Sequence, residues 1–196
     1  MPKLDFWYEF ASTYSYPAAM RIEPLAKAAG VEAVWRPFLL GPIFKAQGWA
    51  TSPFLLQEAK GKYMWRDLAR VCEDAGLPFC RPNNFPARSL LAARTALALG
   101  DQDRPAFSRA VYTAEFADGR DIGESENVAV ILQKLGHDPA VVLARAGEQT
   151  VKDQLRANTE EAQRLGIFGA PSFVLMSGEM FWGNDRLEQA LVRAKR

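Results

Sequence analysis

The chain has 196 residues, of which 48% are hydrophobic and 24% are charged, a composition typical of a globular protein with one domain or one domain plus a large insertion. Its 24 basic and 23 acidic side chains leave a formal net charge of +1. This balance argues against a nucleic acid or an anionic membrane as a partner, because both select a basic excess. With no apolar run near the roughly 18 residues that span a bilayer, and no secretory leader pattern, we expect a soluble cytoplasmic protein.

The first part of the chain predicts a β-α-β unit. Residues 3–10 are rich in aromatic side chains and predict a buried strand. Ser12 and Thr13 then signal the start of a helix over residues 16–29. Residues 31–40 alternate well enough to predict a second strand. A unit of this kind favours parallel strands joined by a right-handed crossover.

The middle of the chain, from about residue 53 to residue 166, predicts helices with few strand signals. Apolar residues recur there at helical spacing, as at Leu90, Ala93 and Leu97. Glycine and proline breakers, such as Gly100, divide the stretch into five or six helices.

After Pro171 the pattern returns to strands. Residues 172–177 and 180–182 predict two strands joined by a tight turn, and a closing helix should run from about Asn184 to Ala194. Either Asn184 or the following aspartate is suited to cap that helix.

The order β-α-β, a block of helices, then β-β-α indicates an α/β fold of the thioredoxin-like class with an all-helical insertion. We expect residues 1–45 and 150–196 to form the thioredoxin-like part and residues 46–149 to form the inserted helical domain.

Ser12 is the first candidate for chemistry. It lies in the turn Ser12-Thr13-Tyr14-Ser15, where a thioredoxin-like chain would carry Cys-x-x-Cys. A hydroxyl cannot exchange disulfides, but at a helix start it can hold the thiolate of another molecule. A hydrogen bond from a hydroxyl to a thiolate is worth roughly 1.5–3 kcal/mol, or about one to two pKa units. The competing interpretation is that Ser12 is a plain helix cap, as most serines before helices are.

Two further segments favour glutathione as the source of that thiol. A cis proline at Pro171 would leave the N–H and C=O of Ala170 free to pair with an extended peptide such as γ-Glu-Cys-Gly. Asp185, at the start of the last helix, could pair with the ligand's α-amino group. A plain turn at Gly169-Ala170-Pro171 and an ordinary cap at Asp185 are the competing interpretations.

At this point the chain resembles the 2-hydroxychromene-2-carboxylate isomerases, in the DsbA-like group that includes the kappa-class glutathione transferases. The matching stretches are DFWYEFASTYSY, RPFLLGPIFK, GIFGAPSF and FWGNDRL, at residues 5–16, 36–45, 166–173 and 181–187. They occur in the same order and near both ends of the chain. One departure is Thr13, where the family often has proline; its hydroxyl could supply a second donor beside Ser12.

The resemblance implies a glutathione-dependent cis–trans isomerase of aromatic catabolism, and a homodimer. Its substrate would be a small aromatic carboxylate, 2-hydroxychromene-2-carboxylate, which becomes trans-o-hydroxybenzylidenepyruvate. The family implies that Ser12 contacts the glutathione sulfur, that Ala170 and Pro171 hold its backbone, and that Asn184 and Asp185 hold its γ-glutamyl end. The expected substrate contacts are Lys45, then Arg36, and Asn84.

Other sites are less well supported by the sequence. The single histidine, His137, lies in a linker, which argues against a catalytic triad or a histidine-rich metal site, and we expect no metal. Cys72 and Cys80 fit structural thiols rather than a redox pair. Two other functions stay open: a kappa-like glutathione transferase or peroxidase, and a non-catalytic thioredoxin-like binding or chaperone module.

Overall fold

A computed structural model describes residues 1–195 of the chain. Four strands form one sheet in the order β2-β1-β3-β4, where β1 is Lys3–Tyr8, β2 Glu32–Pro37, β3 Ser172–Leu175 and β4 Met180–Trp182. The β1 and β2 strands run parallel, whereas β3 is antiparallel to both β1 and β4. Helix α1 (Ser15–Ala29) joins β1 to β2, which confirms the predicted β-α-β unit.

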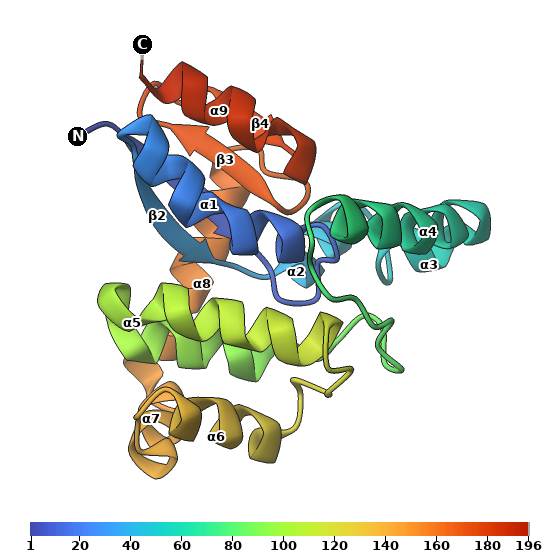
Figure 1. Cartoon of the computed structure of the whole chain (residues 1–196). Coiled ribbons are helices and arrows are strands. Elements are labelled where there is room, and N and C mark those ends of the chain that lie inside the picture. The colour runs from blue at the N-terminus through green and yellow to red at the C-terminus, as the bar shows by residue number, and fades with distance from the viewer. Residues whose placement is uncertain (196) are drawn as a thin grey trace.

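The side chains of β1 alternate between two apolar layers. Leu4, Phe6 and Tyr8 are fully buried in the main hydrophobic cluster together with residues of α1 and of α9 (Leu187–Ala194). Trp7 points to the other face, into a smaller cluster with Val174 and residues around α2 (Leu40–Ala46) and α8 (Gln149–Arg164). Figure 1 shows α8 behind the sheet and α1 and α9 in front of it. The period of two along β1 therefore places helices on both faces.

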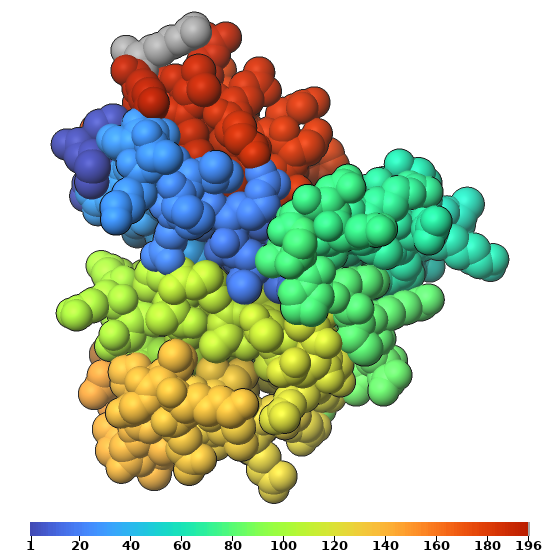
Figure 2. Space-filling view, in the orientation of Figure 1, coloured from blue at the N-terminus to red at the C-terminus, as the bar shows by residue number. Residues whose placement is uncertain are grey.

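The remaining helices form the block that the sequence predicts between the two halves of the sheet. They are α3 (Pro53–Leu56), α4 (Glu58–Asp74), α5 (Leu90–Phe116), α6 (Ser125–Lys134) and α7 (Pro139–Ala146). Helix α5 is kinked at Gly100, one of the predicted breakers. The α3–α4 segment projects from the side of the molecule (Figures 1 and 2). None of the helices within residues 1–195 is both long and apolar enough to cross a membrane.

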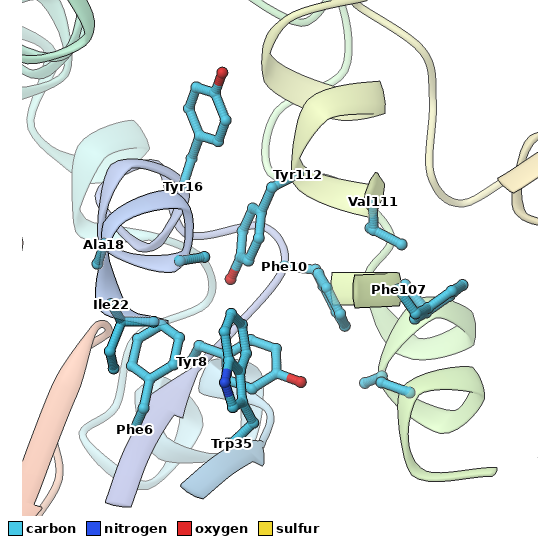
Figure 3. Close-up of a cluster of buried hydrophobic side chains, with 14 of the residues drawn as sticks. Phe6, Tyr8, Phe10, Tyr16, Ala18, Ile22, Trp35, Phe107, Val111 and Tyr112 are labelled. Carbon is cyan, nitrogen blue, oxygen red and sulfur yellow. The ribbon is translucent and has the colours of Figure 1, made fainter. Parts of the chain in front are cut away.

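The inserted helices share a core with the sheet. Side chains of α5, including Phe107 and Tyr112, belong to the same buried cluster as those of β1 and α1. Figure 3 shows the aromatic rings of this cluster filling the space between α1 and α5. The boundaries 1–45, 46–149 and 150–196 stay a prediction, and residue 196 lies outside the described residues. The shared core nevertheless means that α5 can hold parts of the sheet in place.

Two local predictions were wrong. The second strand ends at Pro37 rather than at residue 40, because the following residues form α2, whose first turn accommodates Pro42. The last helix is preceded by a 3₁₀ turn, Asn184–Arg186, and neither the turn nor α9 has a side-chain cap. Asn184 is buried and its Oδ1 accepts a hydrogen bond from Arg21 of α1 at 3.2 Å, so its side chain is used for packing.

Candidate functional site

The Ser12 hydroxyl lies against the loop that precedes β3. Its Oγ donates a hydrogen bond to the backbone oxygen of Ala170 at 2.8 Å, and the Ala170–Pro171 peptide bond is cis. The residue that precedes α1 is Tyr14, and no side chain caps the start of this helix. Ser12 is therefore not the plain helix cap of the competing interpretation. The structure thus brings together three of the predicted site residues, from opposite ends of the chain.

Unpaired backbone donors surround this contact. Within residues 1–195, the N–H groups of Thr13 and Tyr14, just before the first turn of α1, have no hydrogen-bond partner. The N–H of Ala170 likewise has none in that part of the chain. Because α1 has 15 residues and its dipole adds to these donors, the turn favours an anion. Ser12 and Ala170 are both half-buried, so a ligand can reach them.

Asp185 approaches the same loop through Gly183. The N–H of Gly183 donates to the Pro171 oxygen at 2.9 Å, which ties the end of β4 to the proline. Gly183 has φ of 108°, and a Cβ there would lie 2.6 Å from Asp185 Oδ1, so the carboxylate folds back over the glycine. Asp185 also contributes to raising the pKa of the Tyr14 phenol, behind burial and Asp67 as causes, which places its charge near the Ser12 turn.

Helix α4 closes the other side of the turn. The Thr13 hydroxyl, 2% exposed, donates to Met64 Sδ at 3.2 Å, and the Tyr14 hydroxyl donates to Asp67 at 2.7 Å. The Thr13 hydroxyl is therefore directed into the protein and supplies no second donor beside Ser12. These α4 contacts were missed by sequence reasoning, since nothing in the spacing of a helix about 50 positions away shows which face meets the turn.

The three predicted substrate contacts are not brought into direct contact with Ser12. Arg36 lies on β2 and forms an ion pair with Asp5 at 3.2 Å. Asn84 is exposed, and its Nδ2 donates to Asp121 at 2.8 Å. Lys45 is exposed on α2 and forms no ion pair with any residue of the described chain. Their roles stay predictions.

Sequence reasoning also missed Glu9, which is 4% exposed directly behind the Ser12 turn. Burial raises the pKa of its carboxyl to about 7, although hydrogen bonds from the Ser89 hydroxyl and from backbone N–H groups oppose the rise. One signal was available: a lone acidic residue between Tyr8 and Phe10 in a strand-like aromatic run requires an internal partner if it is buried.

Comparison with known proteins supports the fold and the family. A family model described as a DSBA-like thioredoxin domain matches residues 3–193. The chain is 26% identical over 185 residues to a 2-hydroxychromene-2-carboxylate isomerase of Sphingobium xenophagum, with 94% of each chain covered. It is 27% identical over 199 residues to human glutathione S-transferase kappa 1, covering 94% of this chain and 87% of that protein.

Among solved structures, a 2-hydroxychromene-2-carboxylate isomerase superposes with a TM-score of 0.88 at 26% identity, covering 99% of this chain and 96% of the other. A probable DsbA oxidoreductase of Streptomyces coelicolor gives a TM-score of 0.79 at 23% identity, covering 100% of this chain and 90% of the other. The order of the elements and the sheet agree with these likenesses. The chain belongs to the DSBA-like thioredoxin family.

Proposed function

We propose that this protein binds glutathione at the Ser12 turn and uses its thiolate to catalyse the cis–trans isomerisation of 2-hydroxychromene-2-carboxylate to trans-o-hydroxybenzylidenepyruvate. The observation that carries the proposal is the 2.8 Å contact between Ser12 Oγ and the Ala170 oxygen, which joins a hydroxyl donor to a peptide-binding backbone edge. The names of the relatives, isomerases and kappa-class glutathione transferases, support the same choice of ligand and chemistry.

Glutathione binding would exchange hydrogen bonds at this contact. The N–H of the ligand's cysteinyl residue replaces the Ser12 hydroxyl at the Ala170 oxygen, while the free Ala170 N–H donates to a ligand carbonyl. The released hydroxyl then turns to the sulfur. A charge-assisted hydrogen bond of this kind, with the helix start, would lower the pKa of the bound thiol from about 8.5 to around 6.5.

The reaction needs no net oxidation or reduction. The hydroxychromene ring first opens: its C2–O bond breaks as the 2-hydroxyl loses its proton and becomes the keto group, and the ring oxygen takes up a proton as a phenol. The thiolate then forms a sulfur–carbon bond with the open cis enone, and the electron pair of the carbon–carbon double bond moves toward the keto acid, so that this bond loses its double-bond character. Rotation about that bond follows. Return of the electron pair expels the thiolate and restores the double bond in the trans product. The Ser12 hydroxyl donates a hydrogen bond to the thiolate both before it attacks and after it leaves.

The other predicted site residues are assigned to the γ-glutamyl end of glutathione and to the substrate. We propose that Asp185 pairs with the α-amino group of glutathione, because its carboxylate is exposed beside the Pro171 loop, and that Asn184 supports the same γ-glutamyl end. Lys45 is proposed ahead of Arg36 for the substrate carboxylate, since Arg36 already pairs with Asp5. Asn84 is the proposed polar contact from the insertion. Lys45→Ala should raise KM for the substrate without changing glutathione affinity.

A homodimer is the proposed assembly. Large apolar side chains are exposed on and beside the projecting α3 helix, at Trp49 (40%), Leu55 (51%) and Leu56 (50%). A second copy covering them would remove apolar surface from water. Sedimentation equilibrium tests this directly: the wild type should behave as a dimer, and Leu55→Glu should shift it to monomer.

The test of the function is the thiolate absorbance near 240 nm of glutathione bound to the protein, titrated against pH. The wild type should show a bound-thiol pKa well below that of free glutathione, and Ser12→Ala should raise it by about one to two units. Ser177→Ala, in the exposed turn between β3 and β4, is the matched control and should change nothing.

Three outcomes separate the candidate functions. An unchanged bound-thiol pKa in Ser12→Ala would remove Ser12 from the mechanism. Absence of binding at millimolar glutathione would favour the non-catalytic binding module. Product analysis divides the rest: an isomer supports the isomerase, whereas a glutathione conjugate supports the kappa-like transferase, the second candidate because of the 27% identity to the human enzyme.

A further inference from the structure

The side chain of Glu9 connects the Ser12 turn to the inserted helices. One carboxyl oxygen accepts the N–H of Ala11 at 2.8 Å, and the other accepts the hydroxyl of Ser89. Ser89 directly precedes α5, and its hydroxyl makes no capping bond to that helix. Its side chain therefore bonds to Glu9 instead of capping α5.

The backbone carbonyl of Glu9 also links the Ser12 turn to α5. Its carbonyl oxygen accepts the N–H of Ser12 at 2.9 Å and the hydroxyl of Tyr112, near the C-terminal end of α5, also at 2.9 Å. Tyr112 is fully buried, and its ring packs on Phe10 with ring centroids 5.2 Å apart. Figure 3 shows Tyr112 reaching from α5 toward this part of the chain. Two contacts to the turn and two to α5 thus meet at one residue.

We infer that Glu9 is a positioning residue for the Ser12 hydroxyl: its carboxyl and carbonyl groups hold the turn against α5, so that Ser12 faces Ala170. This inference rests on the proposed glutathione site for its functional meaning. The mechanical claim, that Glu9 fixes the Ala11 and Ser12 amides, stands on the contacts alone.

The charge on Glu9 has a second effect on the same site. Its ionisable neighbours are Tyr8 on β1 and Tyr112 and Glu115 on α5, none of which is a cation, and no ion pair to Glu9 is found within residues 1–195. Arg88, next to Ser89, pairs with Asp121 and Glu124 instead. A carboxylate without a cation, placed behind Ser12, opposes the formation of a thiolate in front of it.

The link to α5 survives a change of protonation. When Glu9 is ionised, the Ser89 hydroxyl donates to it; when Glu9 is protonated, the same hydroxyl can accept, because a hydroxyl does both. The Ala11 N–H keeps the other oxygen in either state. Position and charge are therefore separable by substitution. Glu9→Gln keeps an acceptor for Ala11 and removes the charge, whereas Glu9→Leu removes both.

The first test needs no ligand. In the free wild-type protein, the NMR signals of the Ala11 and Ser12 amides should titrate with a midpoint near pH 7, the pKa to which burial raises Glu9. Glu9→Gln should abolish that titration, and Ser89→Ala should move the midpoint upward, since one bond to the carboxylate is lost. Glu115→Gln, another buried carboxyl, should leave the titration in place. Titration that persists in Glu9→Gln would overturn the inference.

The second test uses bound glutathione. Glu9→Gln should lower the pKa of the bound thiol by about one unit, because a nearby charge is gone while the turn is held. Glu9→Leu should raise it, because the Ser12 hydroxyl is no longer aimed. Equal values in the wild type and both variants would refute the positioning role. If the wild type binds no glutathione, the proposed function fails while the amide titration still decides whether Glu9 holds the turn.

Discussion

Replacing Glu9 by glutamine should change how the stability of the protein depends on pH. Burial raises the pKa of this carboxyl from 4.5 to about 7, a difference of about 2.5 units, which corresponds to about 3 kcal/mol of linked stability. The sign follows from proton uptake. Between these two pKa values the folded state holds a proton that the unfolded state has released, so the free energy of unfolding falls as pH rises toward 7. Above that range both states are ionised, and the loss is complete.

The measurement is urea denaturation of the wild type and Glu9→Gln at pH 5 and pH 8.5. The difference in unfolding free energy between the two proteins should move by about 2–3 kcal/mol in favour of the variant at the higher pH, because glutamine carries no proton to lose. Comparing the two proteins cancels the other titrating groups. Glu179→Gln, at an exposed turn, is the control and should leave the pH profile unchanged.

A difference that is the same at both pH values would refute the reasoning, because it would mean that Glu9 ionises in the folded and unfolded states alike. The size of the effect also depends on the Ser89 hydrogen bond, which favours the ionised form. In Ser89→Ala the pKa of Glu9 should rise further, so the loss of stability with rising pH should continue to a higher pH than in the wild type.

Three other substitutions test contacts near the site and within the core. Gly169→Ala would place a Cβ 2.5 Å from Trp182 Nε1 and should cost about 1–3 kcal/mol, seen as a lower urea midpoint; an unchanged midpoint would show that the indole moves freely. Tyr112→Phe removes a fully buried hydroxyl bond and should cost about 1 kcal/mol with no new cavity, measured by thermal melting; no loss would mean that water replaces the bond. Arg104→Met removes a guanidinium that is 5% exposed and bonded to two backbone carbonyls, and should lower the free energy of unfolding by about 3 kcal/mol. Asp101→Asn changes the exposed ion-pair partner of Arg104 and should cost below about 1 kcal/mol. Equal losses in the two variants would contradict the conclusion that the carbonyl bonds contribute more than the ion pair.

Most of the fold was predictable because its signals are local. The aromatic-rich strand within residues 3–10, the helix over residues 16–29 and the breaker at Gly100 each depend on a few neighbouring residues. The structure has β1 at Lys3–Tyr8, α1 at Ser15–Ala29 and a kink in α5 at Gly100, which confirms all three. The errors were local as well. The predicted second strand was too long at its end. The backbone N–H of Phe38 still donates to the Tyr8 oxygen, but Pro42 suits the first turn of α2, and that helix begins at Leu40, where the strand was expected to end.

By itself, then, the sequence determined the order of the elements, the turn at Ser12 and the proline loop, since these follow from spacing along the chain. Only the tertiary structure decided what the Ser12 hydroxyl touches: its partner, Ala170, is 158 positions away. The same is true of Glu9, whose carboxyl meets Ser89 80 positions later, and of the Thr13 hydroxyl, which turns into α4. Hydrogen bonds and desolvation depend on distances in space, and those are set when α5 and the sheet close on one core.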